Sequence, residues 1–248
     1  MIMGGPAASF VLFGLGTLPL LSPYLISNFS LLWCLTFVSA ISLHMAILNT
    51  IPIKIGYFST DGRRMLDLAQ KNVPGKRFLA LYQFNASLLQ GIRPKDIDPD
   101  LKTRVLALPE NSMDHISGLI IAYYMTLDQG HIQQAGDYLD QALKINAYYP
   151  ELFRASLLLE GAYYEAHIRQ NPDTARQWLD QIQEKILIDP STLLRAEAAI
   201  HLAAGDKKSA QNKAEESLAI LQKPQFLPGF TVFEQDRLQV LLQDLATT

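Results

Sequence analysis

The first 53 residues of this 248-residue chain contain no Asp, Glu, Lys or Arg, and Lys54 is the first charged residue. All 21 basic and 24 acidic side chains therefore lie after Ile53. A single soluble globular domain is excluded, because its surface would carry charge throughout. The single cysteine, with 14 glycines and 13 prolines, also excludes disulfide-rich and collagen-like proteins. These absences indicate a membrane-attached protein with a soluble carboxy-terminal part.

The uncharged region contains two apolar stretches, Ala7–Ile26 and Phe29–Thr50, separated only by Ser27 and Asn28. A helix needs roughly 20 apolar residues to cross the hydrocarbon core, so the sequence predicts two membrane spans joined as a tight hairpin. Two glycines and two prolines in the first stretch predict a bent or broken helix. A signal peptide fits less well, because no positive segment precedes the apolar residues and a second apolar stretch follows directly.

The charge that follows the apolar stretches predicts their orientation. Lys54–Arg104 contains ten basic and five acidic residues, and basic residues at a membrane exit favour the cytoplasmic side. Val105–Thr248 contains 11 basic and 19 acidic residues, a balance that argues against nucleic-acid binding. We therefore expect a multi-pass protein of the cell membrane with a cytoplasmic carboxy-terminal part. The lone Cys34 lies mid-helix, where packing is the simplest role.

The segment at the membrane edge, Leu48–Arg64, reads LNTIPIKIGYFSTDGRR. An Asn and a Pro three residues later are followed by the pair Asp61-Gly62. A carboxylate close to the membrane interface is costly unless something binds it. A simpler interpretation is a turn followed by an Asp that caps a helix.

In their order along the chain, these residues resemble site-2-type intramembrane zinc metalloproteases. That family has a His-Glu-x-x-His helix, a Gly-Pro segment at the next membrane stretch, and an Asn-x-x-Pro segment leading to Asp-Gly. The last three elements are matched in order by Gly5-Pro6, Asn49 with Pro52, and Asp61-Gly62. The resemblance covers roughly residues 4 to 66.

The resemblance implies that Asp61 is a zinc ligand and that Asn49, Pro52 and Gly62 belong to the substrate-binding segment. Asn49 would hold a substrate strand through its amide, and Gly62 would allow close backbone approach. The implied reaction is attack on a peptide carbonyl by zinc-activated water, with a Glu as general base.

One element of the family pattern is missing. None of the five histidines is followed by Glu, whereas a catalytic zinc site needs three protein ligands and a water. No catalytic residue is therefore assigned, and zinc is expected only if the missing helix is present upstream of Gly4. We expect a fragment, a start assigned too late, or a relative without that helix. His44 is a conceivable substitute ligand, but a hydrogen-bonded histidine within the membrane is the simpler interpretation.

From Ile116 onward the chain repeats a helix-turn-helix pattern. The second helices are predicted to begin near residues 131, 172 and 206, with small residues at matching positions. This pattern resembles degenerate tetratricopeptide repeats, and a last helix, Phe233–Leu245, would cap them. The paired tyrosines near the first helices are interpreted mainly as packing residues.

The sequence thus predicts an all-α protein in which a transmembrane helical hairpin precedes a cytosolic helical-repeat domain. The predicted segments are 1–53 (two spans), 54–110 (membrane-edge segment, basic helices and linker) and 111–248 (repeat domain). The expected function is part of a zinc metallopeptidase that is inactive as this chain alone. A non-catalytic, membrane-anchored scaffold is the alternative. Expected partners are the membrane, a protein partner or substrate bound by the repeats, and a second copy of the chain or the missing upstream helices.

Overall fold

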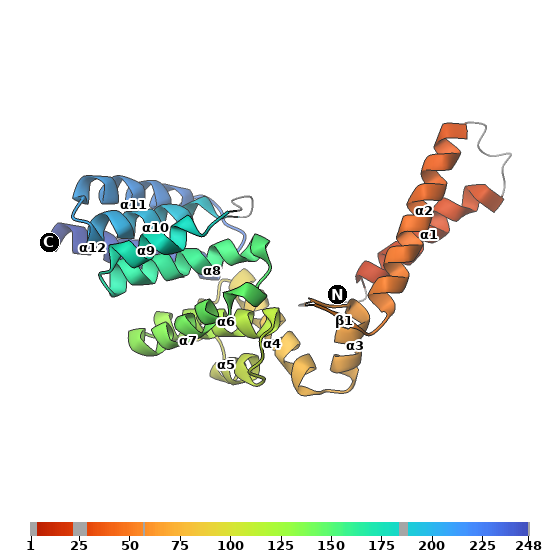
Figure 1. Ribbon diagram of the computed structural model, residues 1–248, viewed down its shortest axis with the longest axis horizontal. Helices are drawn as coiled ribbons and strands as arrows, with labels where there is room; N and C mark the ends of the chain where they lie inside the picture. Colours follow the sequence, from red (N-terminus) through yellow and green to blue (C-terminus); the bar gives the residue numbers. More distant parts are fainter. Residues whose placement is uncertain (1–3, 22–28, 57, 184–187, 248) are drawn as a thin grey trace. The chain divides into compact units, whose positions relative to one another are not determined.

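The computed structural model describes residues 4–21, 29–56, 58–183 and 188–247, which are almost entirely helical (Figure 1). The all-α prediction is confirmed. Contacts between residues divide the chain into two units, one ending at Lys76 and one beginning at Arg77.

The first unit begins with two apolar helices that pack against each other, α1 (Gly4–Leu21) and α2 (Phe29–Thr50). Their contact depends on small residues, because a Cβ on Gly16 would lie 2.0 Å from Ser39 Oγ. Among the described residues, only α2 is long and apolar enough to span a membrane, and the apolar part of α1, Ala7–Leu18, is shorter.

Helix α1 is continuous from Gly4 to Leu21, so the predicted break does not occur within it. Pro19 lies in the last turn of the described helix, where its missing N–H removes one backbone hydrogen bond close to the helix end. Pro23 and the predicted hairpin residues Ser27 and Asn28 lie outside the described residues.

A short antiparallel ribbon, not predicted from the sequence, connects α2 to the next helix. Strand β1 (Lys54–Ile55) pairs with β2 (Phe58–Ser59), with Lys54 opposite Ser59. Gly56 lies in the left-handed region with a φ of 58°, which the tight reversal of the chain requires. Helix α3 (Asp61–Ala69) follows directly.

The second unit is a series of helices connected by short turns. The boundary between the units falls within α4, which begins at Val73. The elements of this part are α4 (Val73–Leu89), η2 (Pro94–Asp96), α5 (Pro99–Leu106), α6 (Met113–Asp128), α7 (Ile132–Lys144), η3 (Asn146–Tyr148), α8 (Glu151–Tyr163), the π-helical turn η4 (Tyr164–Ile168), α9 (Pro172–Asp180), α10 (Pro190–Ala203), α11 (Lys207–Leu221) and α12 (Pro228–Thr247).

Successive helices of this unit pack in pairs, α6 with α7, α8 with α9 and α10 with α11 (Figure 1). The second helix of each pair begins at Ile132, Pro172 and Lys207, within one residue of the predicted positions. Helix α12 begins at Pro228 rather than at Phe233, because proline is accepted in the first turn of a helix. Tyr123, Tyr163 and Tyr164 are buried, which agrees with the packing role predicted for the tyrosine pairs.

Candidate functional site

The junction between α2 and α3 is held together by the hydroxyl of Thr60. The Thr60 Oγ1 donates a hydrogen bond to the Ile51 carbonyl at 2.6 Å and accepts one from the Ile53 N–H at 3.2 Å. It also caps α3 by accepting from the Arg63 N–H at 3.3 Å. The Thr60 side chain thereby links the turn around Pro52 to the start of α3 by hydrogen bonds.

Asp61 is the first residue of α3, where the positive end of the helix dipole favours a carboxylate. The structure gives the capping role to Thr60, so the interpretation of Asp61 as a helix cap is wrong. A Cβ on Gly5 would lie 3.1 Å from Asp61 Oδ2, and a Cβ on Gly62 would lie 1.9 Å from the Thr50 carbonyl oxygen. The start of α1, the end of α2 and the start of α3 therefore meet closely, and a side chain at Gly62 would clash with the end of α2.

The other residues singled out in the sequence lie around this junction or on α2. Asn49 is half-buried in the last turn of α2, and Pro52 is exposed in the turn that Thr60 fastens. His44 is exposed on α2. No group of three or more His, Cys, Asp or Glu side chains positioned to hold a metal ion occurs among the described residues. Asp61 thus contributes one carboxylate to a junction that would need further ligands from elsewhere.

A cluster of four charged side chains in the second unit was not predicted. Glu160 on α8, Arg195 on α10, and Glu234 and Arg237 on α12 are all at most 6% exposed. Glu160 lies 2.7 Å from Arg195 and 2.7 Å from Arg237. Glu234 lies 2.9 Å from Arg195 and 2.8 Å from Arg237. These four residues, the charge ring, alternate in sign and are neutral as a set.

The charge ring keeps its members ionised. Burial alone would raise the pKa of Glu160, but Arg195 and Arg237 outweigh burial and lower this pKa from 4.5 to about 2. The Tyr163 ring lies under both guanidinium groups, 4.3 Å from each, which adds cation–π attraction. Burial also raises the pKa of Tyr163, so its hydroxyl stays protonated. A buried, fully ionised set of this kind suits rigid structure rather than proton transfer at neutral pH.

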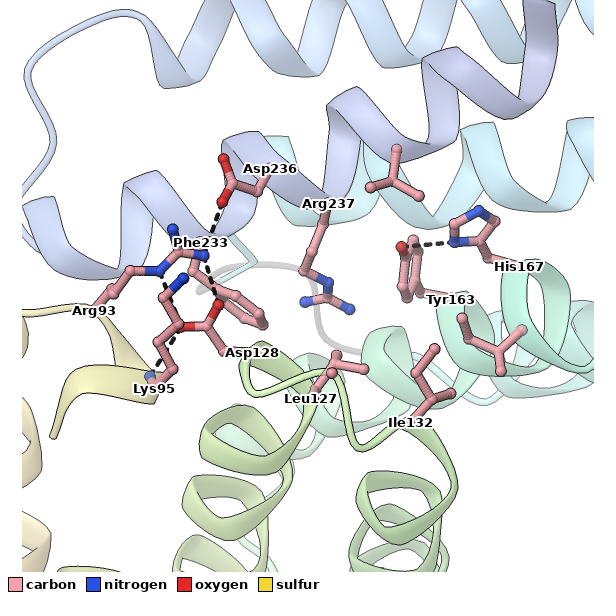
Figure 2. A pocket seen from close by; sticks show the side chains of 13 residues that line it. Arg93, Lys95, Leu127, Asp128, Ile132, Tyr163, His167, Phe233, Asp236 and Arg237 are labelled. Atoms are coloured by element: carbon pink, nitrogen blue, oxygen red, sulfur yellow. Dashed lines mark hydrogen bonds and ion pairs between the residues drawn. The ribbon is translucent and has the colours of Figure 1, made fainter. Parts of the chain in front are cut away.

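A cavity of about 320 Å³ lies beside the charge ring (Figure 2). His167, in the π-helical turn, closes one side and is bonded at both nitrogens, to the Tyr163 hydroxyl at 2.7 Å and to Asp244 at 2.8 Å. Arg93 closes the other side by pairing with Asp128 at 2.5 Å and Asp236 at 2.8 Å. Burial lowers the pKa of His167, which favours the neutral ring.

The sequence contains one indication of the charge ring, namely charged residues at positions that otherwise face the core. Glu160 follows three consecutive leucines, and Arg195 lies between apolar residues on the buried face of α10. A charged residue at a core-facing position predicts a buried partner of opposite sign. The partners could not be named, because Glu234 and Arg237 are distant in sequence and fall in the last helix.

Comparison of the chain with protein-family models, with curated proteins and with solved structures finds no match.

Proposed function

We propose that this chain is part of a membrane-embedded zinc metallopeptidase of the site-2 type, in which Asp61 supplies one zinc ligand. The observation that carries this proposal is the meeting of Gly5, Thr50 and Asp61-Gly62 at one junction. These residues belong to the three sequence elements that resemble the protease family. Their proximity is what a shared site requires, although they are far apart in the sequence.

The contacts at the junction suit a metal-ligating carboxylate. Thr60 ties the start of α3 to the turn after α2, which fixes the backbone of Asp61. Gly5 leaves Asp61 Oδ2 uncovered by a side chain on the α1 side. Zinc bound here would supply an activated water for peptide hydrolysis. The chain alone would be inactive, because the remaining ligands and the general base would come from an upstream His-Glu-x-x-His helix.

The rest of the chain takes supporting roles in this proposal. The apolar side chains of α2 point outward, with Trp33 and Phe37 each more than half exposed, as a lipid-facing helix requires. Helix α1 would complete a multi-pass membrane part, and the basic segment after it would place the second unit in the cytoplasm. The paired helices of that unit would form a tetratricopeptide-like surface for a protein partner or the substrate.

The second candidate is a non-catalytic scaffold that the apolar helices anchor to the membrane. The absence of a three-residue metal group among the described residues favours it. In this alternative, Asp61 simply starts a helix, and the paired helices bind a protein partner. Both candidates share the membrane anchor and differ only in whether Asp61 holds a metal.

The deciding experiment is to read the coding DNA upstream of Met1 in the same frame and to express the extended protein. If a His-Glu-x-x-His helix is present, we expect bound zinc and cleavage of a membrane-spanning reporter peptide. Asp61→Ala should then lower the zinc affinity and the cleavage rate by at least about a hundredfold, since even the loss of a residue that only hydrogen-bonds a metal ligand can cost that much. Asp96→Ala, at an exposed position in η2, is the matched control and should change neither.

Each outcome assigns the chain to one candidate. Zinc binding and cleavage that survive Asp61→Ala would show that the ligand assignment is wrong. A stop codon directly upstream, without the helix, would favour the scaffold.

A further inference from the structure

The cavity beside the charge ring has the size and the walls of a ligand site. Its volume of about 320 Å³ lies at the lower end of the range for small-molecule sites. Four separate parts of the second unit form it, the start of η2, the α6–α7 turn, the end of α8 with the π-helical turn, and α12 (Figure 2). Short π-helical segments occur frequently at functional sites.

The polar groups at the sides of the cavity are already paired within the protein. His167 bonds Tyr163 and Asp244 through its two ring nitrogens. Arg93 is shared by Asp128 and Asp236. A polar ligand group placed deep in the cavity would have to displace these bonds, which is costly for buried groups.

At the inner end of the cavity, the polar groups are likewise paired within the protein or covered from solvent. Arg237 extends toward the cavity between Phe233 and Tyr163 (Figure 2). Its terminal nitrogens bond Glu160 and Glu234 of the charge ring. Its Nε has no partner among the described residues, but it is also covered from solvent, so a ligand in the cavity cannot reach it.

The charges around the cavity balance. Arg237 belongs to the charge ring, which is neutral as a set. The positive charges of Arg93 and Lys95 match the negative charges of Asp128 and Asp236, all of which line the cavity. An ionised ligand would lose its hydration without gaining an opposite charge.

What remains for contact is hydrocarbon. The accessible walls come mainly from apolar side chains on three of these parts: Leu127, Ile132, Ile168, Phe233 and Val240, with the ring of Tyr163. We propose that this cavity binds a small, uncharged, aliphatic molecule. The hydrocarbon part fills the cavity, and any polar end lies at the solvent-exposed rim near Lys95 and Asp236.

The test compares three probes that share one hydrocarbon tail and differ only in charge: 4-methylpentan-1-ol, 4-methylpentanoate and 4-methylpentylammonium. The full chain is placed in lipid nanodiscs, and its isoleucine methyl groups are labelled with ¹³C for NMR titration. We expect the alcohol to shift the Ile132 and Ile168 signals saturably, with half-saturation in the millimolar range or below. The two ions should bind at least tenfold more weakly. Ile121, in a core region that contains none of the residues lining the cavity, should not move.

Two valines on α12 provide a variant and its matched control. Val240 lines the cavity and is 48% exposed, whereas Val232 is 44% exposed and does not line it. Val240→Trp should abolish the shifts, and Val232→Trp should leave them unchanged. The proposal is overturned if the alcohol does not move Ile132 and Ile168, if an ion binds as tightly as the alcohol, or if Val240→Trp binds like the original chain.

Discussion

Removing one carboxylate from the charge ring should destabilise the second unit strongly. In Glu160→Gln the shape of the side chain is kept, but two buried guanidinium groups are left with only Glu234 as a counter-charge. Breaking a buried ion pair by removing one partner costs about 3–5 kcal/mol. The pKa of Glu160 gives a similar figure, because its fall from 4.5 to about 2 corresponds to about 3 kcal/mol of folding free energy.

The assay is urea unfolding followed by the fluorescence of Trp178, which packs against two core regions of the second unit. Trp33→Phe removes the signal of the other tryptophan. The matched control is Glu197→Gln, which breaks the more exposed pair between Glu197 and Lys213, separated by 2.7 Å. A surface pair contributes at most about 1 kcal/mol. Equal losses in the two variants would refute the reasoning.

The same ring predicts an acid dependence with a defined sign. Since the pKa of Glu160 is lower in the fold than in the unfolded chain, its stabilisation is present above pH 4.5. This stabilisation is lost as the pH falls toward 2. The difference in unfolding free energy between the original chain and Glu160→Gln should shrink over this range. A constant difference from pH 6 to pH 2 would contradict the assignment of the low pKa to Glu160.

Three further predictions concern the cavity and the junction between α2 and α3. Arg93→Ala should lower the free energy of unfolding by about 2–3 kcal/mol in urea titrations, because it leaves the buried carboxylate of Asp128 without its cation. The control is Arg176→Ala, which breaks an exposed pair and should lower the free energy of unfolding by less than about 1 kcal/mol. Gly62→Ala should make the junction more sensitive to limited trypsin digestion, because its Cβ would overlap the Thr50 carbonyl at the end of α2. Gly14→Ala is the control, because its Cβ would meet open space and the digestion rate should not change. Burial lowers the pKa of His167 below 6.5, so stability should fall as the pH drops from about 7 to about 5, and His167→Gln should flatten this part of the urea-midpoint profile.

The sequence was most informative where a local pattern determines the structure. The span of α2, Phe29–Thr50, and the starts of α7, α9 and α11 could be predicted, because apolar stretches, glycine turns and Asn-Pro pairs act over a few residues. The two-stranded ribbon before Thr60 was missed, because strands of two residues are too short for any alternating pattern.

The candidate site was predictable only in part. The motif order brought attention to Asp61, but not to Thr60, whose hydroxyl makes the contacts that hold the junction together. The charge ring joins three helices, and its longest contact, between Glu160 and Arg237, spans 77 positions of the sequence. Pairing at that distance depends on how the helices pack, which a pattern of local periodicity does not contain.

The alternating arrangement of the charge ring also has a consequence for how this protein can change during evolution. Any single substitution of a charged member by a neutral residue leaves a buried charge without its full counter-charge. Replacing the whole set with apolar side chains of similar volume can leave the stability of the fold unchanged or even raise it. The route from one arrangement to the other therefore passes through unstable intermediates. Among descendants of this sequence, Glu160, Arg195, Glu234 and Arg237 should be inherited together or lost together.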